Sequence, residues 1–289
     1  MMPITEEVHA FLTANAAAQI QRDDEYLDPA DGLLHCKTCH GLRQTVIPAP
    51  GGTGFLRPRC LCPCQSAAEK QRKAAEEKRE RLERIQRRKA RGLQDRRLYD
   101  CTFANDNGKT PRLTAKAKRY VEHWEDAARK NIGLLLFGDV GTGKSFLAGC
   151  IANALLEQDV PVLMTNFPTI LNRMTGLFGS DRADFLASLN AYDLLILDDL
   201  GTERGTEYAL EQVFAVIDAR YRSRKPLIVT TNLTLDALKH PDDLAHARIY
   251  DRLLEMCCPV CVSGENFRRE NAAQKMDRLK TLIQGKERR

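Results

Sequence analysis

The stretch that decides the fold is residues 132–145, which read IGLLLFGDVGTGKS. It opens with a short apolar run of the kind that forms a buried strand. It ends in the spacing Gly-x4-Gly-Lys-Ser, and an apolar segment that predicts a helix follows. A glycine-rich turn between a buried strand and a helix is the context in which this motif binds the phosphates of a nucleotide. The sequence therefore predicts a phosphate-binding loop at this turn.

Each residue type in this loop has a physical role. Gly138, Gly141 and Gly143 allow a close backbone approach that a Cβ atom would block, so that successive N–H groups point at the phosphates. The following helix adds the positive end of its dipole. Lys144 supplies charge for the β- and γ-phosphates, and the Ser145 hydroxyl is a ligand for Mg2+. The expected nucleotide-binding residues of the loop are Gly138, Asp139, Val140, Gly141, Thr142, Gly143, Lys144, Ser145 and Phe146.

Outward from this loop, short apolar runs alternate with amphipathic helices. The runs read VPVLMT from residue 160, DLLILDD from residue 193 and PLIVTT from residue 226. Helical patterns lie between them, and the one after the loop covers residues 145–157. Such alternation is typical of a parallel sheet flanked by helices. We therefore expect an α/β fold.

Two adjacent carboxylates, Asp198 and Asp199, end the run DLLILDD. In open α/β sheets the ligand lies beyond the carboxyl ends of the strands. Because neighbouring strand residues point to opposite faces, the two acids are expected to have different tasks. We expect Asp198 to complete the cofactor site as a magnesium ligand and Asp199 to orient or deprotonate the attacking water.

A polar residue, Asn232, follows the run PLIVTT. From an adjacent strand it is expected to reach the γ-phosphate or the attacking water; its alternative role is to cap the helix that starts near Thr234. The chain contains no Asn-Lys-x-Asp sequence of the kind that reads guanine. Adenine is therefore the expected base and ATP the expected nucleotide.

Composition narrows the class of protein. With 289 residues and 43% hydrophobic content, the chain can hold one mid-sized domain and a small appendage. The net charge of +5 is concentrated in residues 70–97 and 268–289, which favours a partner with phosphates or acidic patches. The start MMPITEEVHAFL is acidic where a signal peptide is cationic, and no apolar run approaches the roughly 18 residues of a membrane span. We expect a cytoplasmic protein with no membrane contact, in which cysteines bind metal or stay free.

Half of the ten cysteines lie near the amino terminus, on both sides of the turn-forming stretch PAPGGTG. Two short-spaced clusters that bracket a turn are the geometry of a zinc ribbon, and Zn2+ takes four ligands. Cys36 and Cys39 form the first pair of ligands. The second pair is either Cys62 with Cys64 or Cys60 with Cys62. With little hydrophobic core, such a module is expected to need its metal to fold.

The composition changes after this module. Residues 66–98 are charged helix formers in which an acid repeatedly stands four residues before a base, the favourable helical order. We therefore divide the chain into a zinc-binding partner-recognition module (1–65), a charged linker helix (66–98) and an ATPase domain (99–289).

Two further expectations concern packing. Cys258 and Cys261 also have a Cys-x2-Cys spacing, but no second pair accompanies them, so we expect both to be buried as small hydrophobic side chains. Trp124, the single tryptophan, is expected to pack from a helix over residues 114–129.

The motifs GDVGTGKSFLA, YDLLILDDLGTE, RYRSRKPLIVTTNL and ARIYDRLLEMC together resemble the DnaC/DnaI-type helicase loaders and their IstB-like relatives among the AAA+ ATPases. The resemblance covers roughly residues 98–269. It implies a P-loop AAA+ sheet of the additional-strand class. It also implies a sensor-2-like part for Arg268.

The same resemblance implies further catalytic residues. Asn232 matches the sensor-1 position. Arg252 is similar to the arginine finger that reaches the ATP of a neighbouring subunit, and Arg248, one helical turn earlier, is its rival. Asp199 stands where most AAA+ enzymes have glutamate, and Glu203 is a nearby substitute for its role.

The resemblance implies that the protein loads a ring-shaped replicative DNA helicase. The amino-terminal module and the charged helix are expected to bind this helicase. Without a helix-turn-helix, the core of the protein is expected to bind single-stranded DNA through phosphates. An arginine finger acts between subunits, which implies self-association on the partner. The alternative is an IstB-like transposition accessory ATPase acting on duplex DNA, although such relatives generally begin with a helical region. A small-molecule P-loop kinase is disfavoured by the finger and by the absence of an obvious lid.

Overall fold

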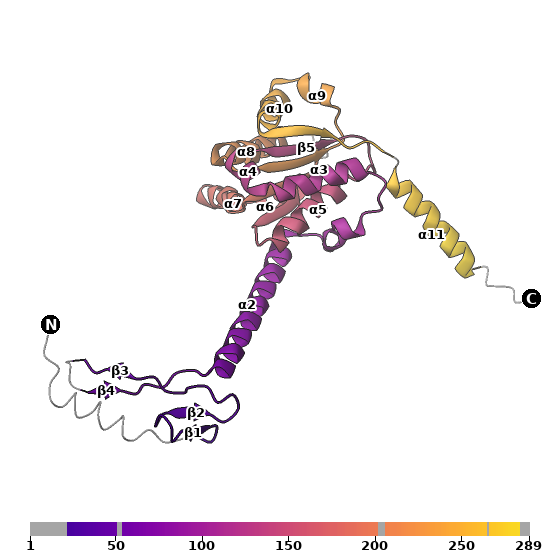
Figure 1. Ribbon diagram of the computed structural model, residues 1–289. Helices are drawn as coiled ribbons and strands as arrows, with labels where there is room; N and C mark the ends of the chain where they lie inside the picture. The colour runs from indigo at the N-terminus through magenta and orange to yellow at the C-terminus, as the bar shows by residue number, and fades with distance from the viewer. Residues whose placement is uncertain (1–21, 51–53, 202–205, 265, 284–289) are drawn as a thin grey trace, which may run out of the picture. The chain divides into compact units, whose positions relative to one another are not determined.

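The computed structural model describes residues 22–50, 54–201, 206–264 and 266–283 of the chain. The boundary between two compact units lies within helix α2 (Pro63–Gly92), between Leu82 and Glu83 (Figure 1). Across the residues described, no helix combines the length and the apolar character that crossing a bilayer requires.

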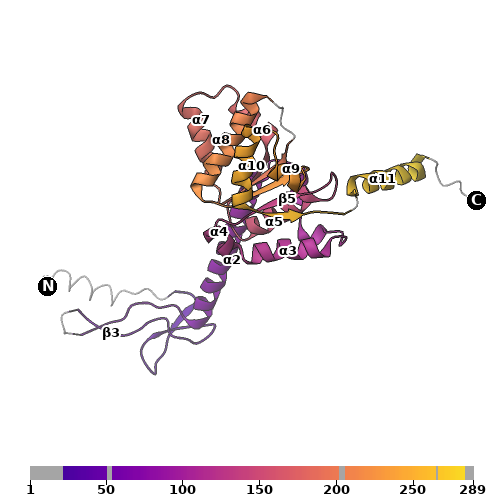
Figure 2. The same cartoon turned by 90° about the horizontal axis from the view of Figure 1, so that it is seen from above.

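The larger unit is built on a five-stranded, all-parallel sheet (Figures 1 and 2). Its strands are β5 (Gly133–Phe137), β6 (Val162–Asn166), β7 (Leu194–Leu200), β8 (Leu227–Thr231) and β9 (Cys257–Cys261). Their order is β6-β7-β8-β5-β9. The strand β8 is therefore inserted between β5, which leads into the phosphate loop, and β7, which carries the paired carboxylates. This confirms the α/β prediction and the additional strand.

Helices cover both faces of the sheet, each over its own apolar cluster. One face carries α3 (Pro111–Glu122), α4 (Trp124–Arg129) and α5 (Lys144–Glu157). The other carries α6 (Phe167–Met174), α7 (Ser180–Asn190), α8 (Glu207–Ser223), α9 (Leu235–Lys239) and α10 (Leu244–Met256). After β9, the chain continues into α11 (Phe267–Ile283). The neighbours Leu135 and Leu136 belong to different clusters because successive strand residues face opposite sides.

A buried arginine holds the amino ends of two central strands. Arg220 is 0% exposed and donates hydrogen bonds to the carbonyl oxygens of Tyr192 (2.9 Å), Asp193 (2.7 Å) and Pro226 (2.7 Å). Burial lowers the pKa of this guanidinium to about 10, so that it remains charged at neutral pH. The residues just before β7 and β8 are thereby fixed to α8.

The helix α2 ends where the chain meets the sheet. A Cβ atom at Gly92 would lie 2.1 Å from the carbonyl oxygen of Val162, so the backbones approach closely only with glycine. Beyond it, Leu93 pairs with Met164 in β6. The charged helix predicted for residues 66–98 therefore stops early, and a 3-10 turn, Arg96–Asp100, follows.

The smaller unit contains two short antiparallel hairpins. One pairs β1 (Glu25–Leu27) with β2 (Leu34–Cys36), and the other pairs β3 (Ile47–Pro48) with β4 (Phe55–Leu56). Its described buried residues are Glu25, Leu34, Cys36, Arg43, Gln44 and Cys62. Arg43 and Glu25 form an ion pair at 2.9 Å. In the part of the module that is described, Leu34 is the one buried aliphatic side chain, which agrees with the prediction of little hydrophobic core.

Two local predictions are wrong. The helix expected over residues 114–129 is two helices, α3 and α4, because His123 between them leaves the helical conformation at ψ 27°. Cys258 and Cys261 are exposed rather than buried, because β9 is an edge strand, and the buried thiol of this run is Cys257. Trp124 is buried as expected.

Candidate functional site

The loop between β5 and α5 has the backbone that its glycines predict. Gly138, Gly141 and Gly143 adopt φ values of 145°, 85° and 95°. A Cβ atom at Gly138 would lie 2.3 Å from the carbonyl oxygen of Val262, which excludes any larger residue. Gly143 is the N-cap of α5, so the loop runs directly into a helix N-terminus.

Lys144 lies across this loop rather than out in solvent. It is 5% exposed, and its Nζ atom donates to the carbonyl oxygens of Gly138 (2.8 Å) and Asp139 (2.7 Å). The hydroxyl of Thr142 donates to the same Asp139 carbonyl at 2.9 Å. These contacts keep a positive charge within the loop, where the predicted phosphates need it.

A threonine hydroxyl connects the Asp198 carboxylate to the backbone of Asp199. Thr230 Oγ1 donates to Asp198 Oδ1 at 2.6 Å and accepts a hydrogen bond from the backbone N–H of Asp199 at 2.9 Å. Burial raises the pKa of the Asp198 carboxyl, against hydrogen bonds from Thr230 and Ser145 that lower it. A carboxylate beside the Ser145 hydroxyl is a donor set that suits Mg2+.

The regular strand geometry assumed for this pair does not hold. Asp199 adopts a left-handed backbone with a φ of 58°, and the pairing of β7 with β8 is irregular between Leu197 and Leu200. The strand alternation from which different tasks were predicted for the two acids therefore does not extend through Asp199. Glu203, the proposed substitute for Asp199, lies outside the described residues, as does the side chain of Arg268.

A cavity of about 610 Å3 joins the loop to the ends of the central strands. Of the predicted residues, its walls include Val140, Gly141, Thr142, Gly143, Lys144, Ser145, Phe146, Asp199 and Asn232. Gly138, Asp139 and Asp198 lie beside this cavity without lining it. Its volume suits a nucleotide-sized ligand.

Sequence reasoning missed two walls of this cavity. One is the segment before and at the start of α3, represented by Asn107, Thr110 and Leu113. The other is Phe267, whose backbone N–H donates to the Gly141 carbonyl at 3.0 Å. No motif marks either segment; each is remote in sequence from the loop and reaches it through tertiary folding.

Asn232 is exposed at the cavity and does not cap the following helix. Thr234 is the N-cap of α9, and its side chain accepts a hydrogen bond from the Ala237 N–H at 3.1 Å. The helix-capping role, which was the alternative to nucleotide contact for Asn232, therefore belongs to Thr234.

The two candidate finger arginines differ in their surroundings. Arg252 forms an ion pair with Asp218 at 2.9 Å and lies over the ring of Phe214, with 4.6 Å from its Cζ atom to the centroid. Arg248 is exposed, and its side chain makes no hydrogen bond or ion pair within the described part of the chain. Arg252 is thus engaged within its own subunit, whereas Arg248 points its charge into solvent.

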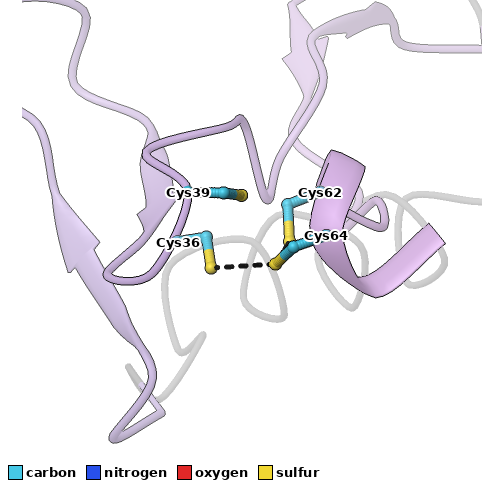
Figure 3. Close-up of side chains that lie close together, drawn as sticks. All are labelled: Cys36, Cys39, Cys62 and Cys64. Carbon is cyan, nitrogen blue, oxygen red and sulfur yellow. Dashed lines mark hydrogen bonds between the residues drawn. The ribbon is translucent and has the colours of Figure 1, made fainter. Parts of the chain in front are cut away.

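The structure selects four of the five amino-terminal thiols (Figure 3). The sulfur atoms of Cys36, Cys39, Cys62 and Cys64 all lie within 4.8 Å of one another. Cys36 belongs to β2, Cys39 to the turn after it, Cys62 directly precedes α2 and Cys64 lies in its first turn. The fifth thiol, Cys60, instead donates to the carbonyl oxygen of Leu42 at 3.5 Å.

The surroundings of this cluster fit a zinc ion. Backbone N–H groups of Cys39 and Thr38 lower the pKa of Cys36 to about 6, which favours the thiolate that binds metal. The Arg43 guanidinium donates to Cys62 Sγ at 3.8 Å and adds positive charge beside the site. Four converging thiols are the ligand set of a structural zinc site.

The two nearby histidines have other partners. His35 bonds to Asp31 through Nε2 at 2.8 Å and to the His40 carbonyl through Nδ1 at 2.9 Å. His40 Nδ1 pairs with the Tyr26 hydroxyl at 3.1 Å. Neither belongs to the four-thiol cluster.

Comparison with known proteins places this geometry in a family. The chain is 28% identical to the replicative helicase loader DnaI of Bacillus subtilis over 150 residues, 48% of either chain. It is 30% identical to the replicative helicase loader DnaC of Escherichia coli K12 over 162 residues, 53% of this chain and 63% of that one. The chain thus spans about half to just under two thirds of the length of these relatives.

A solved structure and a family model agree with the fold. The crystal structure of the DnaC helicase loader matches with a TM-score of 0.50 and 21% identity, over 58% of this chain and all of that one, which supports the fold alone. The model of the IstB-like ATP binding protein matches residues 68–275, well over half of the 289 residues. The chain therefore belongs to the family of IstB-like ATP binding proteins.

Proposed function

We propose that this chain is an ATP-dependent loader of a replicative DNA helicase, which binds ATP with Mg2+ and single-stranded DNA. The observation that carries the proposal is the cavity in which the phosphate loop, Asp199 and Asn232 come together. Two relatives of this core are named replicative helicase loaders. The core would hydrolyse ATP, and the amino-terminal module would hold the helicase.

The site residues divide the work of hydrolysis. The loop N–H groups and Lys144 bind the phosphates and hold them in line for attack. Ser145 and Asp198 would hold Mg2+, which neutralises developing charge when bound. Asp199 and Asn232 orient the attacking water from the ends of neighbouring strands.

An arginine from a neighbouring subunit would complete the site on assembly. Arg248 fits this role better than Arg252, because its guanidinium is exposed whereas Arg252 is bound to Asp218 and Phe214. A finger in trans stabilises charge in the transition state and makes hydrolysis depend on assembly.

The zinc cluster would serve structure rather than chemistry. Cys36, Cys39, Cys62 and Cys64 would hold the ion and fix the two hairpins against the start of α2. The described residues that line the nucleotide cavity all belong to the larger unit. The use of the module would therefore be to present a surface to a protein partner.

The test compares two interactions of the full chain in one preparation. A loader should retain a ring-shaped replicative helicase from the same organism and, with ATP, bind labelled oligo-dT more tightly than a duplex of equal length. A transposition accessory ATPase should prefer the duplex and leave the helicase unbound. Tight duplex binding without helicase capture would end the loader assignment.

A further inference from the structure

A second cavity, of about 470 Å3, lies on the larger unit away from the nucleotide site. Its lining combines a basic row with an uncharged floor: Arg84, Arg87, Arg88, Arg91, Pro161, Val162, Ala191 and Tyr192. We call it the arginine groove. None of its residues belongs to the nucleotide cavity.

The groove lies at the amino ends of the strands, whereas the phosphate loop follows the carboxyl end of β5. Val162 begins β6, and Tyr192 stands just before β7. The loop, Asp199 and Asn232 lie instead at the carboxyl ends of their strands. A ligand in the groove and a nucleotide in the cavity therefore occupy separate sites.

The four arginines project from two successive turns of α2, at spacings that place them on neighbouring rows of the helix. Two of them are fixed to the core. Arg84 Nε and Arg88 Nε each lie 2.7 Å from a carboxylate oxygen of Asp159, a residue just after α5. Lys89 adds a bond to Glu157 at 2.9 Å. These contacts hold this part of α2 at the groove.

The other two arginines keep their charge available. Arg87 and Arg91 are exposed, and neither side chain has a hydrogen-bond or ion-pair partner among residues that the structure describes. The described lining of the groove carries four guanidinium groups and no carboxylate, and Asp159, outside the lining, pairs with two of them. The groove therefore has a surplus of positive charge that suits an anionic ligand.

The floor of the groove is rigid and includes an aromatic ring. Arg220 fixes the backbone of Tyr192 and Asp193 through their carbonyl oxygens, and the Tyr192 ring packs partly against the core. Pro161, Val162 and Ala191 complete an uncharged surface. A positive row beside an aromatic platform is the combination that binds single-stranded nucleic acid, because phosphates meet the charges and a base stacks on the ring.

We propose that the arginine groove is the single-stranded DNA site of this protein, with phosphates on Arg87 and Arg91 and a base against Tyr192. The inference rests on the proposed function and assigns a binding site to the single-stranded DNA of that function. An acidic protein segment would match the arginines, but it has no flat base to cover the uncharged floor. Single-stranded DNA uses both halves of the groove.

The test measures binding of fluorescein-labelled oligo-dT to the full chain over a range of salt concentrations. The variant Arg87→Ala/Arg91→Ala should bind on the order of tenfold more weakly at moderate salt. Its slope of log K against log salt should fall by about 1.4, since each single-strand phosphate contact contributes about 0.7. The matched control is Lys70→Ala/Lys78→Ala, which removes two exposed charges from the same helix outside the groove.

A further variant separates stacking from charge. Tyr192→Leu should weaken binding roughly fivefold or more at every salt concentration, with the salt slope unchanged, because stacking releases no counterions. Arg87→Lys/Arg91→Lys should keep the slope, since a lysine also meets a phosphate. Unfolding midpoints should match those of the unmodified chain for the arginine variants, whose side chains are exposed.

Three outcomes would overturn the inference. Unchanged DNA binding by Arg87→Ala/Arg91→Ala is the first, and an equal loss in the lysine control is the second. The third is a loss of helicase capture with DNA binding intact, which would assign the groove to an acidic protein surface. Groove-dependent DNA binding without helicase capture would instead keep this inference and end the loader proposal.

Discussion

The amino-terminal module and the larger unit, here called the core, bury different kinds of residues. In the core, Leu194, Leu195, Ile196 and Leu197 of β7 are all 0% exposed between two layers of helices. In the described part of the module, the one buried aliphatic side chain is Leu34, and the others are a charged pair, a glutamine and two cysteines. The core is stabilised by apolar burial, whereas the module depends on polar contacts around four thiols.

This difference shows how size selects a folding strategy. A domain of the core's length buries enough apolar surface to offset its conformational entropy, but a few dozen residues generally do not. A metal site closes that gap by joining distant parts of a short chain. The two units should therefore unfold independently. The module should unfold when it loses its metal, and the core when its apolar packing is disturbed.

The largest expected effect is on the module. Cys36→Ser with Cys39→Ser should abolish a content of about one zinc per chain and unfold the module, since structural zinc contributes on the order of 10 kcal/mol in small domains. Metal analysis and limited proteolysis measure both changes, and ATP binding by the core should persist.

The matched control is Cys60→Ser, which changes a thiol outside the cluster and should retain the metal. A zinc-free, protease-resistant module from a preparation without chelator would remove the contrast between the two units.

The second effect is confined to the chemistry of the core. Lys144→Ala should reduce ATP hydrolysis to background, because it deletes the charge held within the phosphate loop. The unfolding midpoint and the zinc content should stay unchanged. Lys130→Ala, an exposed lysine of the same unit, provides the control. Near-normal turnover by Lys144→Ala would place hydrolysis elsewhere.

The third effect distinguishes Arg248 from Arg252, because one is expected to act only in the assembled protein and the other within its own subunit. Arg248→Ala should spare stability and monomer ATP binding but lower hydrolysis of the assembled protein on the order of 10³-fold. Arg252→Ala should instead lower the free energy of unfolding by about 1–3 kcal/mol, since it removes a half-buried ion pair and an aromatic contact.

Mixed assemblies identify which arginine acts in trans. Arg248→Ala combined with Lys144→Ala should recover part of the activity, because one subunit keeps the phosphate loop and the other keeps the finger. Recovery by the Arg252→Ala mixture alone would reverse the assignment.

The smallest effect concerns the point where α2 ends on the core. Gly92→Ala should destabilise the core by roughly 1–3 kcal/mol, because its Cβ atom would press on the Val162 carbonyl. Denaturant unfolding measures this change, while zinc content reports on the module. Ala90→Ser, exposed in the same helical turn, should be neutral. An equal loss of zinc and of core stability in Gly92→Ala would mean that the units do not fold separately.

Sequence predicted the parts of this molecule that are local. The phosphate loop and the position of Asn232 at a strand end each follow from a few adjacent residues, and the parallel sheet follows from the alternation of short apolar runs with helical patterns. The contribution of Phe267 to the cavity and the capture of Arg252 by Asp218 depend on contacts between segments far apart in the chain. The four clustered thiols are an intermediate case: spacing identified five candidates for metal binding, and the positions of the sulfur atoms set Cys60 apart from the other four.

The left-handed backbone at Asp199 gives a physical reason for an aspartate at a position where the resemblance to AAA+ ATPases leads one to expect glutamate. Aspartate and asparagine adopt positive φ more readily than most other residues, because their short polar side chains bond locally. Asp199→Glu would lengthen the acid and also strain the left-handed backbone. A change in hydrolysis by this variant could therefore not be assigned to either cause alone. Asparagine keeps both the backbone preference and the length while removing the charge. At this position, the amide and not the longer acid is the conservative replacement.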